Sequence, residues 1–157
     1  MNIDNLDIKI LQELCEDSRR SFRQVARKIG VSIATVASRV KKLEDSGIIR
    51  GYTAILDHEK LGYELSVIIE VTVSKGKLLE VEEKLSRSPN VCAVYDVTGL
   101  TDAMIIAKFR NRKNLSKFVK SLLSMEFVER TNTHVVLTTV KEDFRSPMIK
   151  PKHEQPF

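Results

Sequence analysis

The spacing of apolar residues changes at Gly47, and this change most constrains how the chain can fold. Before Gly47, apolar residues recur every three or four positions, which is the period of a helix with one buried face. Beyond it, apolar and polar residues alternate in several short runs, as in strands with one buried face. The 157 residues therefore predict an α+β fold in which a small helical part precedes a larger mixed part.

The helical part contains three segments with this spacing. The first covers residues 4–17. The second begins at Ser21, which has a glutamine three residues later as in a capping box, and it ends at Gly30. The third covers about residues 32–46 with Ser32 as its N-cap. We expect the three helices to bury Leu6, Ile10, Leu14, Phe22, Val25, Ala26, Ile29, Ile33, Val36, Val40 and Leu43.

Positive charge is concentrated in this part of the chain. Residues 18–43 contain eight Lys or Arg and no acid, whereas residues 1–17 contain five acids and one Lys. Residues 57–140 are nearly balanced, with twelve basic and eleven acidic residues. A cationic window of this length favours a polyanionic partner over an ordinary solvated surface.

The outward face of the third helix is small and hydroxylated at its start and basic farther along. Small side chains allow a helix to enter the major groove of DNA, hydroxyl groups bond bases or phosphates, and cations contact guanine or phosphate. Two helices joined by a tight glycine turn predict a helix-turn-helix. Two short strands that turn near Arg50–Gly51 would add a wing. The expected DNA-contacting residues are Ser21, Ser32, Ala34, Thr35, Ser38, Arg39, Lys42 and Arg50.

Residues 4–57 resemble the winged helix-turn-helix of the leucine-responsive/asparagine-responsive (Lrp/AsnC) regulators, also called feast/famine regulators. The pieces that carry the resemblance are LDIKILQELCEDSR, SFRQVARKIGVS, the T-V-x-x-R-V run at Thr35–Val40, and LEDSGIIRGYTAILD. The resemblance implies a DNA-binding transcriptional regulator with double-stranded DNA as its partner.

The rest of the chain predicts a second domain. Strand-like and helix-like runs follow one another in the order β-α-β-β-α-β, with the last strand at residues 131–140, which is the ferredoxin-like unit. Both helices would cover one face of a four-stranded antiparallel sheet. The other face would expose Ile68, Val94, Ile106 and Val136, and an open apolar face predicts a homodimer. The expected domains are a winged helix-turn-helix at 1–57, a linker at 58–63, the ferredoxin-like domain at 64–142 and a flexible tail at 143–157.

This second part resembles the regulatory domain of the same family, so the resemblance covers about residues 3–142. In the family, the turn between the second and third strands lies where dimers meet in tetramers or octamers, and small amino acids bind there. A glycine allows close approach to backbone N–H groups, and an Asp can pair with the ammonium of the ligand. Family members often have an acid directly after the glycine, where this chain has Leu100. The implied effector-binding residues are Thr98, Gly99, Thr101, Asp102 and Thr133.

The sequence predicts no catalytic residues, no metal site and no cofactor. The three histidines, His58, His134 and His153, are scattered, and no Gly-rich phosphate loop, H-E-x-x-H or G-x-S-x-G motif is present. Cys15 and Cys92 are far apart and have no metal-ligand spacing. Two other functions stay open: an architectural protein that compacts DNA with little sequence choice, and a sirohaem-decarboxylase-like enzyme on the same layout.

No apolar run reaches the ~18 residues that a membrane span needs, and the polar, acidic N-terminus is unlike a signal peptide. We therefore expect a cytoplasmic protein with no membrane partner.

Overall fold

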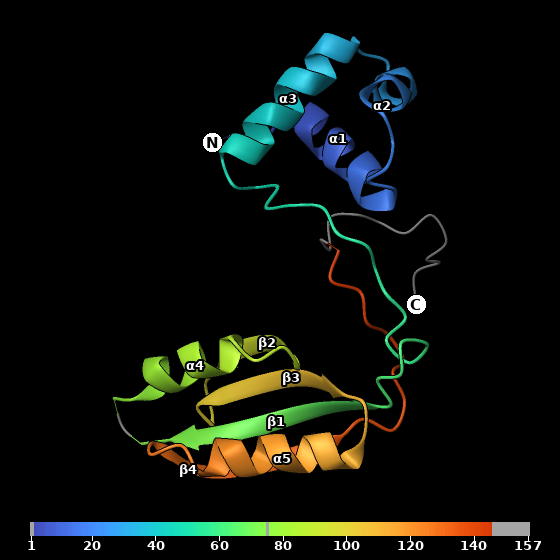
Figure 1. Ribbon diagram of the computed structural model, residues 1–157. Coiled ribbons are helices and arrows are strands. Elements are labelled where there is room, and N and C mark those ends of the chain that lie inside the picture. Colours follow the sequence, from blue (N-terminus) through green and yellow to red (C-terminus); the bar gives the residue numbers. More distant parts are fainter. Residues whose placement is uncertain (1, 75, 146–157) are drawn as a thin grey trace. The chain divides into compact units, whose positions relative to one another are not determined.

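The computed structural model describes residues 2–74 and 76–145 (Figure 1). These residues form two units. The first is built from the described residues up to Ile55 together with those from Glu142 on, and the second runs from Leu56 to Lys141. Each unit has its own apolar core, and each is described by itself below.

Side-chain caps define the three helices of the first unit. The Asp4, Ser21 and Ser32 side chains each accept a hydrogen bond from a backbone N–H of the first helical turn, which confirms the predicted caps of the second and third helices. The second helix ends at Gly30, whose φ of 76° lies in the left-handed region that favours glycine. The helices are α1 (Asn5–Glu16), α2 (Phe22–Ile29) and α3 (Ile33–Asp45).

The core of the first unit is a single apolar cluster with contributions from all three helices. Phe22 and Ile33 were expected in it, but both side chains are exposed. Each is the first residue of its helix and therefore lies at the rim, where the neighbouring helices no longer cover it. The cluster consists of Ile10, Leu14, Val25, Ala26, Val36 and Val40.

The two short strands expected near Arg50–Gly51 are not formed. Instead, the backbone N–H groups of Ile48 and Ile49 both bond to the carbonyl of Leu43, so the chain stays coiled against the end of α3. Two strands alone are marginally stable because they bury little apolar surface.

The second unit has the predicted ferredoxin-like order of elements, and its sheet has the strand order β2-β3-β1-β4 with all neighbours antiparallel (Figure 1). Its elements are β1 (Leu65–Val73), α4 (Leu78–Ser86), β2 (Val91–Asp96), β3 (Ala103–Phe109), α5 (Arg112–Leu123) and β4 (Val128–Val135).

Both helices of the second unit pack on one face of the sheet. Every second residue of β1 and β3 points into this core, with Ile69 in register with Ile105 at its centre. Leu85 from α4 and Leu122 from α5 belong to the same buried cluster. The alternation of buried and exposed residues along β1 is the one that the sequence predicts.

Two details of the sheet differ from expectation. Val94 was placed on the open face, but it is in register with Ile105 and packs against the helix-facing core. An irregularity between Val91 and Ala93 shifts the register of β2, and a shift of one residue exchanges the two faces. The last strand was expected at residues 131–140. It instead covers Val128–Val135, and one further hydrogen bond joins the Val136 N–H to the Ser66 carbonyl near the start of β1.

Two adjacent leucines of α5, one buried and one exposed, allow the packing of this core to be tested by mutation. Leu122 is fully buried, whereas Leu123 is 49% exposed. Leu122→Ala removes buried methyl groups and leaves a cavity, so it should lower the free energy of unfolding by about 2–5 kcal/mol. Leu123→Ala, the matched control, should lower it by less than ~1 kcal/mol. Urea unfolding of the two variants measures the difference, and equal losses would contradict the packing described here.

Candidate DNA-binding and effector-binding surfaces

The start of α3 presents small and hydroxylated side chains. The Ser32 hydroxyl accepts a hydrogen bond from the Thr35 backbone N–H (3.0 Å) and lies 2.8 Å from the Thr35 hydroxyl. Ala34 and Ser38 follow on the exposed surface, four residues apart and hence on one face. This end of the helix is therefore rigidly capped and narrow, with no bulky side chain at Ala34 or Ser38.

Acids outside the cationic window, some adjacent to it and some distant in the sequence, form ion pairs with five of its eight cations. Arg20 and Lys28 both pair with Glu13 and Glu16 on α1. In the described part of the chain, the window residues without an ion pair are Arg23, Arg27 and Lys42. The positive surface is thus much smaller than the window of eight cations suggested. The window residues that form ion pairs are Arg19, Arg20, Lys28, Arg39 and Lys41.

Arg39 has partners inside the protein. Its guanidinium lies 2.6 Å from Asp4 Oδ2 and 3.1 Å from Asp7 Oδ1, and Asp7 is completely buried. A hydrogen bond from the Asp7 backbone N–H and a second from Arg39 lower the pKa of Asp4 below its ordinary 3.8. Arg39 therefore fastens α3 to the first turn of α1. A direct contact between Arg39 and DNA stays a prediction.

The remaining expected DNA contacts are at the start of α2, on α3 and in the segment after α3. Ser21 forms a reciprocal capping box with Gln24 at the start of α2, and its hydroxyl bonds the Gln24 side chain. Lys42 and Arg50 are exposed. The Tyr52 hydroxyl donates to Glu44 (2.9 Å), which ties the segment after α3 to the helix. The sequence did not predict this hydrogen bond, because a tyrosine eight residues after an acid is not a recognisable local pattern.

The turn between β2 and β3 is fastened to the end of β1. The Thr101 hydroxyl and the Asp102 backbone N–H both donate to the Val71 carbonyl, at 2.8 and 3.0 Å. The Asp102 carboxylate accepts a bond from the Val73 backbone N–H through Oδ2, at 2.8 Å. A carboxylate accepts up to about four hydrogen bonds, so this contact leaves capacity for a ligand ammonium group.

Four of the five expected effector residues come together in this turn. Thr98 and Gly99 lie at its exposed tip beside Leu100, which is fully exposed. Thr133 is apart from them. It lies on β4, in register with Ile69, and β1 separates it from the turn.

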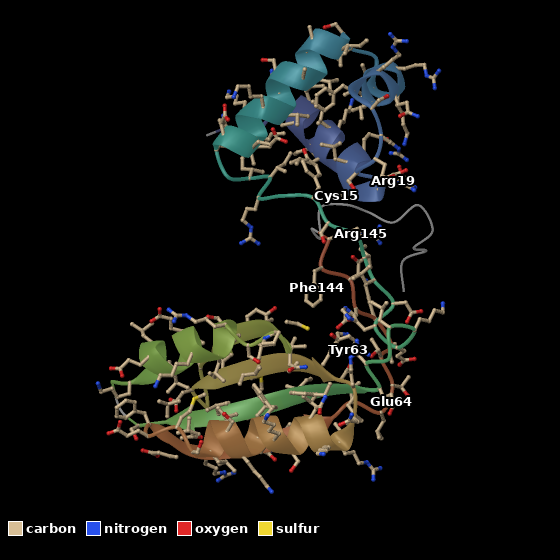
Figure 2. The ribbon with its side chains drawn as sticks, viewed as in Figure 1. Cys15, Arg19, Tyr63, Glu64, Phe144 and Arg145 are labelled. Atoms are coloured by element: carbon tan, nitrogen blue, oxygen red, sulfur yellow. The ribbon has the colours of Figure 1, made fainter. Side chains whose placement is uncertain are left out.

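The expected tail is described only as far as Arg145, and residues 146–157 lie outside the described residues. Arg145 pairs with Asp143 at 2.7 Å. Figure 2 labels Phe144 and Arg145 on this segment and Cys15 on α1. Burial raises the pKa of the Cys15 thiol, and Arg145 opposes that rise.

Within residues 2–74 and 76–145, no group of three or more His, Cys, Asp or Glu side chains is arranged to hold a metal ion. No helix in the same residues is long and apolar enough to cross a membrane.

Comparisons with known proteins agree with this geometry. Residues 3–50 match the family model of winged helix-turn-helix DNA-binding domains, and residues 66–146 match that of the Lrp/AsnC ligand binding domain. An uncharacterised HTH-type transcriptional regulator of Pyrococcus furiosus is 53% identical, over 92% of this chain and 98% of that protein. The HTH-type transcriptional regulator FL11 of Pyrococcus horikoshii is 35% identical, over 93% of this chain and 97% of its own length.

Solved structures match over similar lengths. The complex of a Neisseria meningitidis transcriptional regulator with L-Met has a TM-score of 0.86 and 32% identity, over 94% of this chain and 97% of that one. E. coli AsnC has a TM-score of 0.85 and 27% sequence identity, and the match covers 91% of this chain and 97% of that one.

Fold, surface and relatives together define a helix-turn-helix transcriptional regulator with a ligand-binding domain, a class of regulators and not of enzymes. Within that class, the chain belongs to the Lrp/AsnC family.

The hydrogen bonds that the Asp4 carboxylate accepts from the Asp7 backbone N–H and from Arg39 predict a pH dependence of stability. Asp4→Asn keeps a good N-cap but removes the charge. Because the folded pKa of Asp4 lies below its unfolded value, its contribution is present above the unfolded pKa and is lost as the pH falls through the folded one. Urea unfolding should show the variant less stable than wild type near neutral pH, with the two converging below pH 3.8.

The control for this measurement is Asp45→Asn, which removes an exposed partner of Lys41. Exposed pairs of this kind contribute little, so its stability should stay near that of wild type at every pH. A deficit of Asp4→Asn that is equally large at neutral and acid pH would contradict the role given to its charge.

Proposed function

We propose that this regulator binds duplex DNA sequence-selectively by inserting the start of α3 into the major groove. The observation that carries the proposal is the exposed face of α3, which is narrow at its capped end and carries the unpaired Lys42 near its other end. A recognition helix reads base edges with its N-terminal residues, while cations farther along contact phosphates. The proposed contact residues are Ser21, Ser32, Ala34, Thr35, Ser38, Lys42 and Arg50.

Arg39 acts in this proposal mainly as a positioning residue. Its bonds to Asp4 and Asp7 set the orientation of α3 on α1, and thereby the face that α3 presents. Loss of this contact would weaken DNA binding even if the guanidinium never touches a base.

A second copy of the chain is the proposed occupant of the open face of the sheet. Ile68 and Ile106 lie in register on this face, and Tyr95 beside them is 46% exposed. Apolar side chains on a sheet face favour burial against a partner. A homodimer would present two α3 helices, which fit successive major grooves when they are about 34 Å apart. Assembly of dimers into tetramers or octamers is proposed with it.

The proposed effector is a small amino acid bound at the turn formed by Thr98, Gly99, Thr101 and Asp102, with Thr133 as a further candidate. The L-Met complex of the Neisseria meningitidis relative supports this class of ligand. Asp102 is already held in place by the Val73 N–H, so its carboxylate is preorganised for an ammonium group. If the effector shifts assembly, linkage requires that DNA and effector change each other's affinity by the same factor.

One observation favours the architectural alternative. Because Arg39 is engaged by two carboxylates, the exposed face of α3 carries few long side chains that could read bases. The ratio of specific to non-specific affinity at fixed salt separates the two functions. A regulator should reach ~10³ or more, and a compacting protein should stay near one.

Ala34→Glu tests the major-groove proposal. Ala34 is the second residue of α3, where an acid is compatible with the helix dipole and should not harm folding. In the groove, however, the carboxylate would face phosphates, so duplex affinity should fall by at least ~100-fold in fluorescence anisotropy. Leu79→Glu places the same charge at the second residue of α4, where Leu79 is exposed, and should bind like wild type. Equal affinities of the two variants would refute the proposal.

Asp102→Asn tests the effector site without releasing the turn. Asparagine keeps an oxygen that can accept from the Val73 N–H but loses the charge that would pair with an ammonium group. Calorimetric titration with L-methionine should show affinity reduced by roughly ten- to a hundredfold, because a charge-assisted bond contributes about 1.5–3 kcal/mol. Asp96→Asn, at the end of β2, is the charge-matched control. Unchanged methionine binding in Asp102→Asn would remove Asp102 from the site.

A further inference from the structure

The second unit contains its own cationic segment, which the overall charge balance conceals. Between Asp102 and Glu126 the chain has six Lys or Arg and no acid. Two of these cations are engaged within the unit: Arg110 stacks on Tyr63 at 4.9 Å, and Lys108 is buried in β3. The others are on α5. They are Arg112, Lys113, Lys117 and Lys120.

Three of these lysines form a single stripe on α5. Lys113, Lys117 and Lys120 follow one another at intervals of four and three residues, which places them on one face of the helix. All three are exposed. The opposite face packs into the sheet through Leu122. Among the residues that the structure describes, none of the three lysines nor Arg112 forms an ion pair.

This arrangement is electrostatically unfavourable within the protein itself. Two cations occupy the first turn of α5, where the helix dipole favours acids, and no acid is present there. Lys113 and Lys117 are a like-charged pair at i and i+4, which costs a few tenths of a kcal/mol. Such a surface is stabilised when an anion binds to it.

The other helix on the same sheet face is organised differently. On α4 and its N-cap, Lys77 pairs with Glu80, and Arg87 pairs with Glu83, each at 2.5 Å. Both helices are exposed to solvent on their outer side. Solubility alone therefore does not explain why, among the described residues, the cations beside α4 are paired with acids while those of α5 are not. The difference indicates that α5 has an anionic partner.

We propose that the Lys113–Lys117–Lys120 stripe of α5 is a second DNA-contacting surface, which binds backbone phosphates without reading sequence. The inference rests on the proposed function, because a chain held on duplex DNA through α3 experiences a high effective concentration of backbone phosphates. Lysines bind phosphate as point charges. Exposed Ser116 and Ser121 beside the stripe offer hydroxyl donors of the kind that contact phosphates.

The test compares two full-length triple variants on a short and a long duplex. Lys113→Gln/Lys117→Gln/Lys120→Gln removes the α5 stripe, and Lys77→Gln/Lys84→Gln/Arg87→Gln removes the same charge from α4 and its caps. Glutamine is a good helix former, so both variants should fold, as circular dichroism will verify. The short duplex carries only the two half-sites, and the long one extends several helical turns on each side.

On the long duplex, the α5 variant should lose at least tenfold in affinity, and the slope of log affinity against log salt should fall by roughly 1 to 3 per protomer. On the short duplex it should bind like wild type. The α4 variant should match wild type on both.

Equal losses in the two triple variants would show a bulk charge effect and overturn the inference, as would an unchanged long-duplex slope in the α5 variant. If the α5 variant changes its mass in sedimentation but keeps the wild-type salt slope, the stripe makes contacts between copies of the chain. That result would also overturn the inference. Failure of wild type to bind the short duplex would overturn the proposed function. Long-duplex binding that still depends on the α5 lysines would then support phosphate binding by the stripe on its own, independently of recognition by α3.

Discussion

The first unit depends on how the buried carboxylate of Asp7 is satisfied. A fully buried acid is costly unless a cation or hydrogen-bond donor reaches it, and here Arg39 comes from α3 to do so. The same arginine contacts Asp4, the residue that caps α1. One side chain thus joins the start of α1 to the middle of α3. The orientation of α3, the helix that we propose to enter the major groove, therefore follows from an interaction inside the protein.

The proposed DNA contacts depend on which cations form ion pairs within the protein and which do not. In the first unit, acids of α1 neutralise Arg20 and Lys28, which leaves cations such as Lys42 for an external anion. In the second unit, α4 carries internal ion pairs, and α5 has none among its described residues. Unpaired charges, and not the total count of basic residues, therefore locate the surfaces that we assign to DNA.

Helix ends and the order of elements were predictable from the sequence, whereas the exact register of strands and the partners of individual side chains were not. The caps at Ser21 and Ser32 and the end of α2 at Gly30 depend on neighbouring residues, and all three were predicted. The alternation in β1 likewise predicted its buried face. The register of β2 was missed at Val94, because an irregularity of one residue has no sequence signal. The partners of Arg39 lie 35 and 32 residues away, so no local pattern could reveal them.

The central claim is that two copies of the chain place α3 in neighbouring major grooves of one duplex. Hydroxyl-radical footprinting of the full-length protein on an operator-containing duplex tests it most directly. The account predicts two protected patches on one face of the duplex, about one helical turn or 34 Å apart. Uniform protection without periodicity, or no protection at low salt, would contradict it.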